Sequence, residues 1–150
     1  MAATLSPQEI AEKSAAAMMS LDHASRALKI QVVAIAPGHA TLTMKVRHDM
    51  SNGHGICHGG FIFTLADTAF AFACNSYNQR VVAQQNQITY VAPGQIGDTL
   101  TACAHEVSKT GRSGVYDVTV TAPDGTQIAL FRGLSRSIKG QHFQEDGAFE

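Results

Sequence analysis

Residues 52–75 read Asn-Gly-His-Gly-Ile-Cys-His-Gly-Gly-Phe-Ile-Phe-Thr-Leu-Ala-Asp-Thr-Ala-Phe-Ala-Phe-Ala-Cys-Asn, a glycine- and histidine-rich loop that runs into a very apolar segment. The glycines predict irregular backbone up to residue 60. From Phe61 to Cys74 nothing breaks a helix, and the polar residues Thr64, Asp67, Thr68 and Asn75 fall near one stripe. This pattern predicts a buried helix that carries a carboxylate. An ionised carboxylate is costly to bury unless it is paired, hydrogen-bonded or reached by solvent, so Asp67 needs a functional or structural explanation.

The bulk composition is that of an ordinary globular protein. The 150 residues are 45% hydrophobic and 15% charged, with a formal net charge of -1. This length predicts a single domain over residues 1–150. No run of Lys or Arg gives an electrostatic case for nucleic acid or a membrane surface as a partner. Three cysteines without a CxxC pair, and an N-terminus without a signal-peptide pattern, favour free thiols and a cytoplasmic location.

An N-terminal helix is predicted ahead of the first strand. Ser6 and Pro7, with Glu9 three residues after Ser6, form the pattern of a helix cap, so we expect a helix over about 7–21. Its apolar stripe is expected to contain Ile10, Ala17, Met18 and Leu21, which suggests an amphipathic lid. The polar tail over about 140–150 is expected to fray.

Six strands are predicted around the central helix. Alternating or β-branched sequences, bounded by turn residues, place them at 28–35, 39–47, 81–91, 99–107, 115–121 and 127–138. The first two should form a hairpin, and the last four an antiparallel meander. This order predicts an α+β fold in which an antiparallel sheet wraps around one long helix. Such a sheet leaves the helix partly uncovered, so we expect a homodimer with neighbouring central helices.

Several short motifs resemble those of the hotdog-fold acyl-CoA thioesterases. They are Asn52-Gly53-His54, Cys57-His58-Gly59-Gly60, Leu65-Ala66-Asp67-Thr68, Gly-Val-Tyr-Asp at 114–117 and Ala-Leu-Phe-Arg-Gly at 129–133. The resemblance spans about residues 28–138, and within the family the sequence is most similar to the phenylacetate-degradation, or PaaI-type, subgroup. It implies a hotdog fold, hydrolysis of phenylacetyl-CoA or hydroxyphenylacetyl-CoA, and no cofactor beyond the coenzyme A of the substrate. It also implies a dimeric catalytic unit, which we expect to assemble as a dimer of dimers, a homotetramer.

Gly59 and Asp67 are the candidate catalytic pair. The first N–H groups of a helix are unpaired donors at the positive end of its dipole, so the Gly59 N–H, with or without that of Gly60, can stabilise an oxyanion. The resemblance favours Gly59, whereas the alternative is that both glycines only cap the turn. Asp67 would act as nucleophile or general base; alternatively it is a core carboxylate satisfied by Thr64 or the loop.

The spacing of the pair has a consequence for assembly. Asp67 follows Gly59 by eight residues, roughly 12 Å along a helix, which is too far for both to act on one carbonyl. Gly59 of one subunit would therefore face Asp67 of its partner, and the resemblance implies the same shared site.

Two loop residues and one strand supply supporting candidates. Asn52 could orient water or the carbonyl oxygen, or be a turn residue. His58 could contact the thioester, although a structural role is favoured. Some relatives place a Ser in the strand after the helix to position water. Residues 81–87 contain none, so that role is vacant or falls to Gln84, Gln85 or Asn86.

The remaining candidates concern the substrate. Coenzyme A phosphates would be bound by Lys109, Arg112 and Arg136, unless these are ordinary solvated cations. By resemblance, Gly60 contributes to substrate binding, and the pantetheine path is lined by Tyr90, Val91, Ala92, Pro93, Gly94 and Gln95. The acyl pocket is expected between helix phenylalanines such as Phe61 and the N-terminal helix.

The sequence also bears on two other chemistries and two other functions. His54 and His58 lack a third ligand, so no metal site is predicted, and Cys57 is expected to be a buried thiol rather than a nucleophile. A hotdog thioesterase for other acyl groups, and a non-catalytic acyl-CoA-binding or regulatory module, remain as alternatives. A binding module needs no buried acid or oxyanion donor, so Asp67 and Gly59 favour the enzyme.

Overall fold

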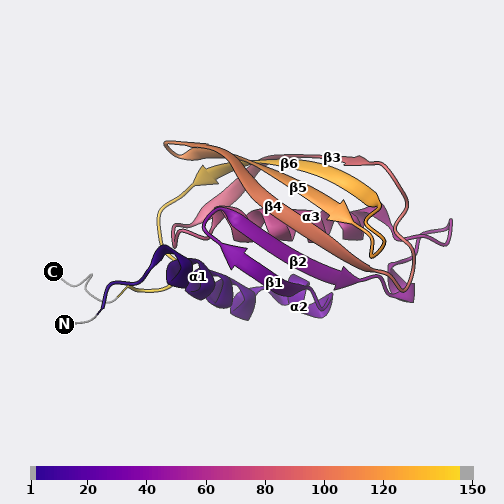
Figure 1. Ribbon diagram of the computed structural model, residues 1–150, viewed down its shortest axis with the longest axis horizontal. Coiled ribbons are helices and arrows are strands. Elements are labelled where there is room, and N and C mark those ends of the chain that lie inside the picture. The colour runs from indigo at the N-terminus through magenta and orange to yellow at the C-terminus, as the bar shows by residue number, and fades with distance from the viewer. Residues whose placement is uncertain (1–2, 146–150) are drawn as a thin grey trace.

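The computed structural model describes residues 3–145. These residues form one antiparallel sheet with α-helices on its open side (Figure 1). The elements are α1 (Pro7–Leu21), α2 (His23–Ala27), β1 (Gln31–Ala36), β2 (His39–Lys45), the 3-10 turn η1 (His48–Met50), α3 (Gly59–Cys74), β3 (Val81–Tyr90), β4 (Thr99–Thr110), β5 (Ser113–Thr121) and β6 (Gln127–Ser137). The predicted α+β architecture, with one long central helix, is confirmed. The short helices α2 and η1 were not predicted.

The strand order across the sheet is β1-β2-β4-β5-β6-β3, and every neighbouring pair is antiparallel. The predicted hairpin of β1 and β2 is confirmed, and β4, β5 and β6 form a meander. The prediction of a four-strand meander was wrong for β3, because this strand pairs with β6, Tyr90 lying opposite Ala129. The segment 91–98 crosses the end of the sheet, so that β4 can pair with β2 and β3 becomes an edge strand. An edge position tolerates the polar sequence of β3.

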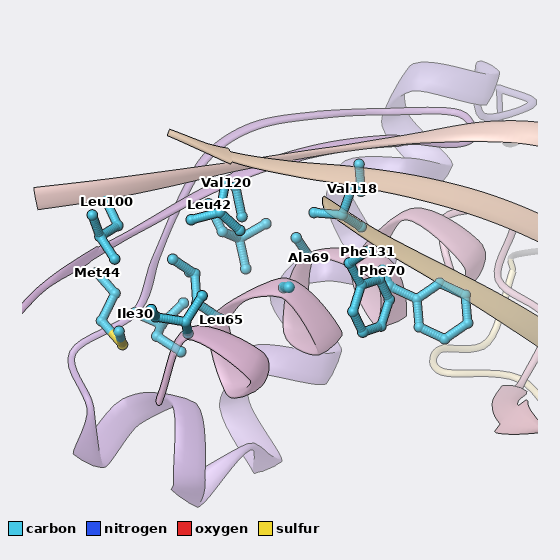
Figure 2. Packing of buried hydrophobic residues seen from close by; sticks show 14 of the residues in the cluster. Ile30, Leu42, Met44, Leu65, Ala69, Phe70, Leu100, Val118, Val120 and Phe131 are labelled. Carbon is cyan, nitrogen blue, oxygen red and sulfur yellow. The ribbon is translucent and has the colours of Figure 1, made fainter. Parts of the chain in front are cut away.

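The hydrophobic core lies between α3 and the concave face of the sheet. Figure 2 shows Leu65, Ala69 and Phe70 on the helix facing side chains of the strands. Gly133 on β6 is required there, because a Cβ at this position would lie 2.7 Å from the Phe70 ring. Burial of this apolar surface is the main stabilising contribution of α3. The opposite stripe of the helix, which includes Gly60, Thr64, Asp67 and Ala71, keeps some exposure.

Helix α1 packs on β1 mainly through small residues, and Ile10, Ala17 and Met18 of the predicted stripe are partly buried. Its start is as predicted, since Ser6 Oγ accepts from the Glu9 N–H at 3.1 Å and Glu9 accepts from the Ser6 N–H at 2.7 Å. The buried residues are Ala11, Ser14 and Ala15. Leu21 is 75% exposed, so its assignment to the buried face was wrong. Small side chains let the helix approach the strand closely, and they set which face is buried.

The C-terminal segment, residues 138–145, is attached to the rest of the protein. The buried Asn78 donates to the carbonyl oxygen of Phe143 at 3.0 Å and to Glu145 at 2.9 Å, and its own oxygen accepts from the His142 and Phe143 N–H groups. In Figure 1 the chain after β6 passes down to α1, where Lys13 lies 5.9 Å from the centre of the Phe143 ring. The expected fraying is therefore wrong for 140–145, and 146–150 lie outside the described residues.

Within residues 3–145, no helix is both long enough and apolar enough to cross a bilayer.

Candidate active site

The start of α3 exposes a single free backbone donor. His58 is the N-cap residue, and its Nδ1 atom accepts a hydrogen bond from the Gly60 N–H at 3.0 Å. The Phe61 N–H donates to the His58 carbonyl at 3.0 Å. The Gly59 N–H forms no hydrogen bond within residues 3–145. The geometry thus makes Gly59, rather than Gly60, the donor available to a ligand, and it gives His58 a structural role.

Tyr90, at the end of β3, lies directly on Gly59. Its hydroxyl donates to the Gly59 carbonyl oxygen at 2.8 Å. A Cβ at position 59 would lie 3.0 Å from a ring carbon of Tyr90, so a side chain there would displace the tyrosine. The glycine is therefore needed for the close approach between the strand end and the helix start.

A groove of about 540 Å³ opens beside this helix start. It brings together the predicted residues Asn52, Gly59 and the turn 90–94, with Ile56, Cys57 and Ile62 completing the walls. The Cys57 N–H donates to the Gly94 carbonyl at 2.8 Å, which joins the loop to the turn. Gln95 is exposed and does not line the groove. Sequence reasoning missed Ile56 and Ile62, since an apolar residue in an apolar segment carries no functional signal.

The side-chain oxygen of Asn52 holds the loop, whereas its side-chain nitrogen is free within the described residues. Its Oδ1 atom accepts from the His54 N–H at 2.9 Å and from the Ile56 N–H at 3.3 Å, which is the turn role considered above. Its amide nitrogen donates to no atom within residues 3–145 and borders the groove. Asn52 can therefore offer a donor, but not an acceptor, to a ligand.

Cys57 and Phe61 do not provide chemistry at this groove. All three cysteines are free, as predicted, and burial raises the pKa of the Cys57 thiol, which disfavours the nucleophilic thiolate. Phe61 packs edge-on against His58, with 6.2 Å between the ring centres. Its expected place in an acyl pocket stays a prediction.

Asp67 lies midway along α3 and is held by a strand rather than by its own helix. Its Oδ1 atom accepts a hydrogen bond from the Asn86 side chain at 2.8 Å. The proposed alternative partner Thr64 instead donates to the Gly60 carbonyl at 2.9 Å, so that alternative is wrong. Burial raises the pKa of the Asp67 carboxyl group, and the hydrogen bond from Asn86 partly opposes this shift. No salt bridge to Asp67 is formed within the described part of the chain.

Asn86 is the member of the three strand candidates that reaches the carboxylate. It pairs with Gly133 and faces α3, whereas Gln84 lies at an irregularity between Ala83 and Gln85. The Oδ1 atom of Asn86 is buried and has no hydrogen-bond partner within residues 3–145. Strand alternation could have found this residue, because Asn86, Ile88 and Tyr90 share one face.

The three predicted cations gather at the other end of α3. Lys109 and Arg112 line a second groove of about 630 Å³, together with Lys139. The Lys109 ammonium group lies 3.7 Å from the centre of the Tyr77 ring, Arg112 donates to the Ser137 carbonyl at 3.0 Å, and Arg136 donates to Ser113 at 3.4 Å. Because α3 is 16 residues long, roughly 24 Å, these cations are far from Gly59 of the same chain.

The fold and these motifs match known proteins. Residues 54–129 match the sequence profile of the Thioesterase superfamily. The acyl-coenzyme A thioesterase PaaI of Escherichia coli is 44% identical over 128 residues, which cover 85% of this chain and 91% of that protein. The human acyl-coenzyme A thioesterase 13 is 34% identical over 116 residues, which cover 76% and 79% of the two chains.

Solved structures agree with the sequence relatives. The structure of the E. coli PaaI protein from the phenylacetic acid degradation operon superposes with a TM-score of 0.89 at 43% identity, covering 91% of this chain and 99% of that one. The Streptococcus mutans protein smu.793, bound to acetyl CoA, superposes with a TM-score of 0.72 at 29% identity, covering 75% and 90%. The chain belongs to the thioesterase superfamily, and within it to the hotdog-fold acyl-CoA thioesterases of the PaaI type.

Proposed function

We propose that this chain hydrolyses phenylacetyl-CoA or hydroxyphenylacetyl-CoA to the free acid and coenzyme A, as a step of phenylacetate catabolism. The observation that carries the proposal is Asp67, a partly buried carboxylate that has no cationic partner among residues 3–145. It lies on the helix whose first N–H, at Gly59, is free within the same residues. The substrate is proposed from the relative in E. coli, whose structure is described as a protein of the phenylacetic acid degradation operon.

The chemistry needs one group to polarise the carbonyl and another to drive attack on it. The Gly59 N–H binds the developing oxyanion, and the positive end of the α3 dipole adds to this stabilisation. Asp67 either takes a proton from water, which then adds to the carbonyl carbon, or adds itself and is released by water. In the first route the carbon–sulfur bond breaks and the proton taken from water passes to the departing thiolate. In the second route attack by the carboxylate expels the thiolate and leaves an acyl-aspartyl anhydride; water then hydrolyses this anhydride, which releases the acid and restores Asp67, and a proton from that water neutralises the thiolate. The amide nitrogen of Asn52 can donate to the thioester oxygen or to the water.

The unbroken course of α3 supports a shared site. The helix is unbroken from Gly59 to Cys74, so Gly59 and Asp67 of one chain stay roughly 12 Å apart. The stripe of α3 that contains Asp67 is not covered by the sheet, and the free edge of β3 lies beside it. We therefore propose a dimer with antiparallel central helices as the catalytic unit, and a dimer of dimers as the assembly.

The same arrangement gives the cations a role. In one chain Lys109, Arg112 and Arg136 lie beyond the C-terminal end of α3, far from Gly59. In an antiparallel pair, however, that end lies beyond the partner's helix start. The pantetheine would lie in the groove beside residues 90–94, and the coenzyme A phosphates would reach these cations. The proposed location is the cytoplasm, on the basis of the free thiols.

A second candidate is hydrolysis of another acyl-CoA. It is favoured by the relative from Streptococcus mutans, which was solved with acetyl CoA bound. Steady-state release of thiol from a panel of acyl-CoA esters separates the two candidates by their kcat/KM values.

The decisive variant is Asp67→Asn, with Asp124→Asn on an exposed turn as the matched control. Asp67→Asn should lower kcat by at least about 100-fold, because the amide can neither attack nor accept a proton. Asp124→Asn should leave kcat unchanged. Undiminished turnover by Asp67→Asn would refute the catalytic assignment, whereas binding without hydrolysis of any acyl-CoA by the unmodified protein would support a binding module.

A further inference from the structure

A third groove, of about 380 Å³, opens on the uncovered side of α3 beyond Asp67. Its walls come from four parts of the chain that are distant in sequence: α1, α3, β3 and the C-terminal segment. The residues that matter here are Met18, Leu21, Ala71, Val82, Ile138 and His142. Neither the carbonyl chemistry nor the coenzyme A path described above uses this groove.

The groove is a gap between two points where α3 is fastened to β3. The first is the hydrogen bond from Asn86 to Asp67 at 2.8 Å. The second is at Asn75, which donates to the Val81 carbonyl at 3.1 Å and accepts from the Val81 N–H at 2.9 Å. Midway between them on the same helix face stands Ala71. Its methyl group is too small to close the gap between helix and strand.

The groove lies about one helical turn beyond the reacting carboxylate. Ala71 follows Asp67 by four residues, which places it roughly 6 Å further along the same face of the helix. This is about the reach of an arylacetyl group from its carbonyl carbon. An acyl group whose carbonyl lies at Asp67 and whose chain points along α3 therefore enters this groove.

The walls are mainly apolar, although the charged residues Asp22 and Arg80 also line the groove, and they are open to solvent in the single chain. Leu21 is 75% exposed, Val82 is 45% exposed and Ile138 is 38% exposed. Exposed apolar side chains that gather around a hollow mark a binding surface. Met18 adds an unbranched, adaptable side chain on the α1 side.

The fourth wall is fixed in place. His142 lies in the C-terminal segment, and its Nε2 atom is 2.7 Å from the Asn75 side-chain oxygen. The hydrogen bonds of Asn78 hold the residues on either side of the ring. The segment that follows the last strand is thus held against the fold and forms part of the groove.

We infer that this groove binds the apolar acyl group of the substrate, and that Ala71 and the exposed side chains around it set the acyl preference. This assignment rests on the proposed function, since it takes the carbonyl carbon to lie at Asp67. It makes α1 and the C-terminal segment specificity elements, in agreement with the expected lid role of the N-terminal helix.

Filling the groove tests the assignment. Ala71→Leu should lower kcat/KM for phenylacetyl-CoA at least about tenfold, because the added side chain occupies the space of the ring. The inhibition constant of free coenzyme A, which lacks an acyl group, should stay within about twofold. Ala16→Leu, on the exposed face of α1 that lines a different groove, is the matched control and should change neither value.

Leu21→Ser provides a second variant that does not depend on repacking, because this side chain is already exposed. It should raise KM for phenylacetyl-CoA and leave coenzyme A inhibition unchanged. Unchanged kcat/KM in both variants would overturn the assignment. So would a fall in kcat/KM that only accompanies loss of the dimer in light scattering, because the groove would then act through the subunit contact and not through the acyl group. Absence of hydrolysis of every acyl-CoA by the unmodified protein would instead overturn the proposed function and this inference together.

Discussion

Replacement of Gly59 by proline should remove the oxyanion donor while α3 stays folded. Proline has no N–H, and the first position of a helix is where it is best tolerated. His58, the preceding residue, has φ -60° and ψ 130°, the extended conformation that a following proline requires. The Gly59 N–H forms no hydrogen bond within the described residues, so the helix loses none.

Gly59→Ala is the matched control for this substitution. Both variants place a Cβ 3.0 Å from the Tyr90 ring, which is 48% exposed and can shift outward. Only the proline also removes the donor, so the ratio of the two kcat values isolates the N–H group. Loss of one oxyanion donor costs about 100- to 1,000-fold in kcat, or about 2.7–4 kcal/mol of transition-state stabilisation.

The assay is steady-state thiol release from phenylacetyl-CoA, with thermal unfolding followed by circular dichroism to verify that both variants fold. The proline variant should fall about 100- to 1,000-fold below the alanine variant. Equal kcat values in two folded variants would refute the role of the Gly59 N–H.

The same substitution tests whether the site is shared. Purified heterodimers of Gly59→Pro with Asp67→Asn contain one site with both groups intact, so they should recover about half of the wild-type activity. No recovery in heterodimers verified by mass would mean that Gly59 and Asp67 of different subunits do not act together.

Two further predictions concern β3 and β6. Asn86→Leu removes the hydrogen bond that opposes the burial-raised pKa of Asp67, so this pKa should rise further and the acidic limb of the kcat–pH profile should move to higher pH. Gln87→Leu, on the other face of β3, is the control. An acidic limb that does not move in Asn86→Leu would contradict a positioning role for Asn86. Gly133→Ala should lower the free energy of unfolding by about 1–3 kcal/mol, because the added Cβ would lie 2.7 Å from the Phe70 ring. In the control Gly53→Ala the added Cβ has no neighbouring atom within 4 Å, so the midpoint of urea unfolding should change little. Equal stability of the two variants would contradict the packing argument.

Local sequence patterns predicted the elements better than their partners. The helix 61–74 was found from its apolar run, and the observed α3 extends it by only the two glycines that precede Phe61. The pairing of β3 with β6 was missed, because strand periodicity carries no information on which distant strand supplies the hydrogen bonds. On α1 the inclusion of Leu21 in the buried stripe was wrong, since hydrophobicity favoured Leu21 while close packing buried Ala11 and Ala15.

The candidate site divides in the same way. Gly59 and Asp67 could be proposed from glycines ahead of a helix and a carboxylate inside it, and Asn52 and Tyr90 from the motifs around them. The choice of Asn86 from three neighbouring polar residues required the face of β3 that meets α3, which depends on the irregularity near Gln84. The place of the cations beyond the far end of α3 depends on how the strands are arranged around the helix, so no local pattern could have given it.

The contacts between α3 and β3 divide the helix and the strand into segments of nearly equal length. Tyr90 meets Gly59, and Asn86 meets Asp67: eight helix residues, roughly 12 Å, are matched by four strand residues, roughly 13 Å. The next eight residues, to Asn75, are matched by five, to Val81, and the irregularity between Ala83 and Gln85 takes up the extra one. The residue spacing along the edge strand β3 thus matches the residue spacing along α3. A single residue inserted between Asn86 and Tyr90 would turn one of these side chains away from α3, so the contacts to Gly59 and Asp67 could not both be kept.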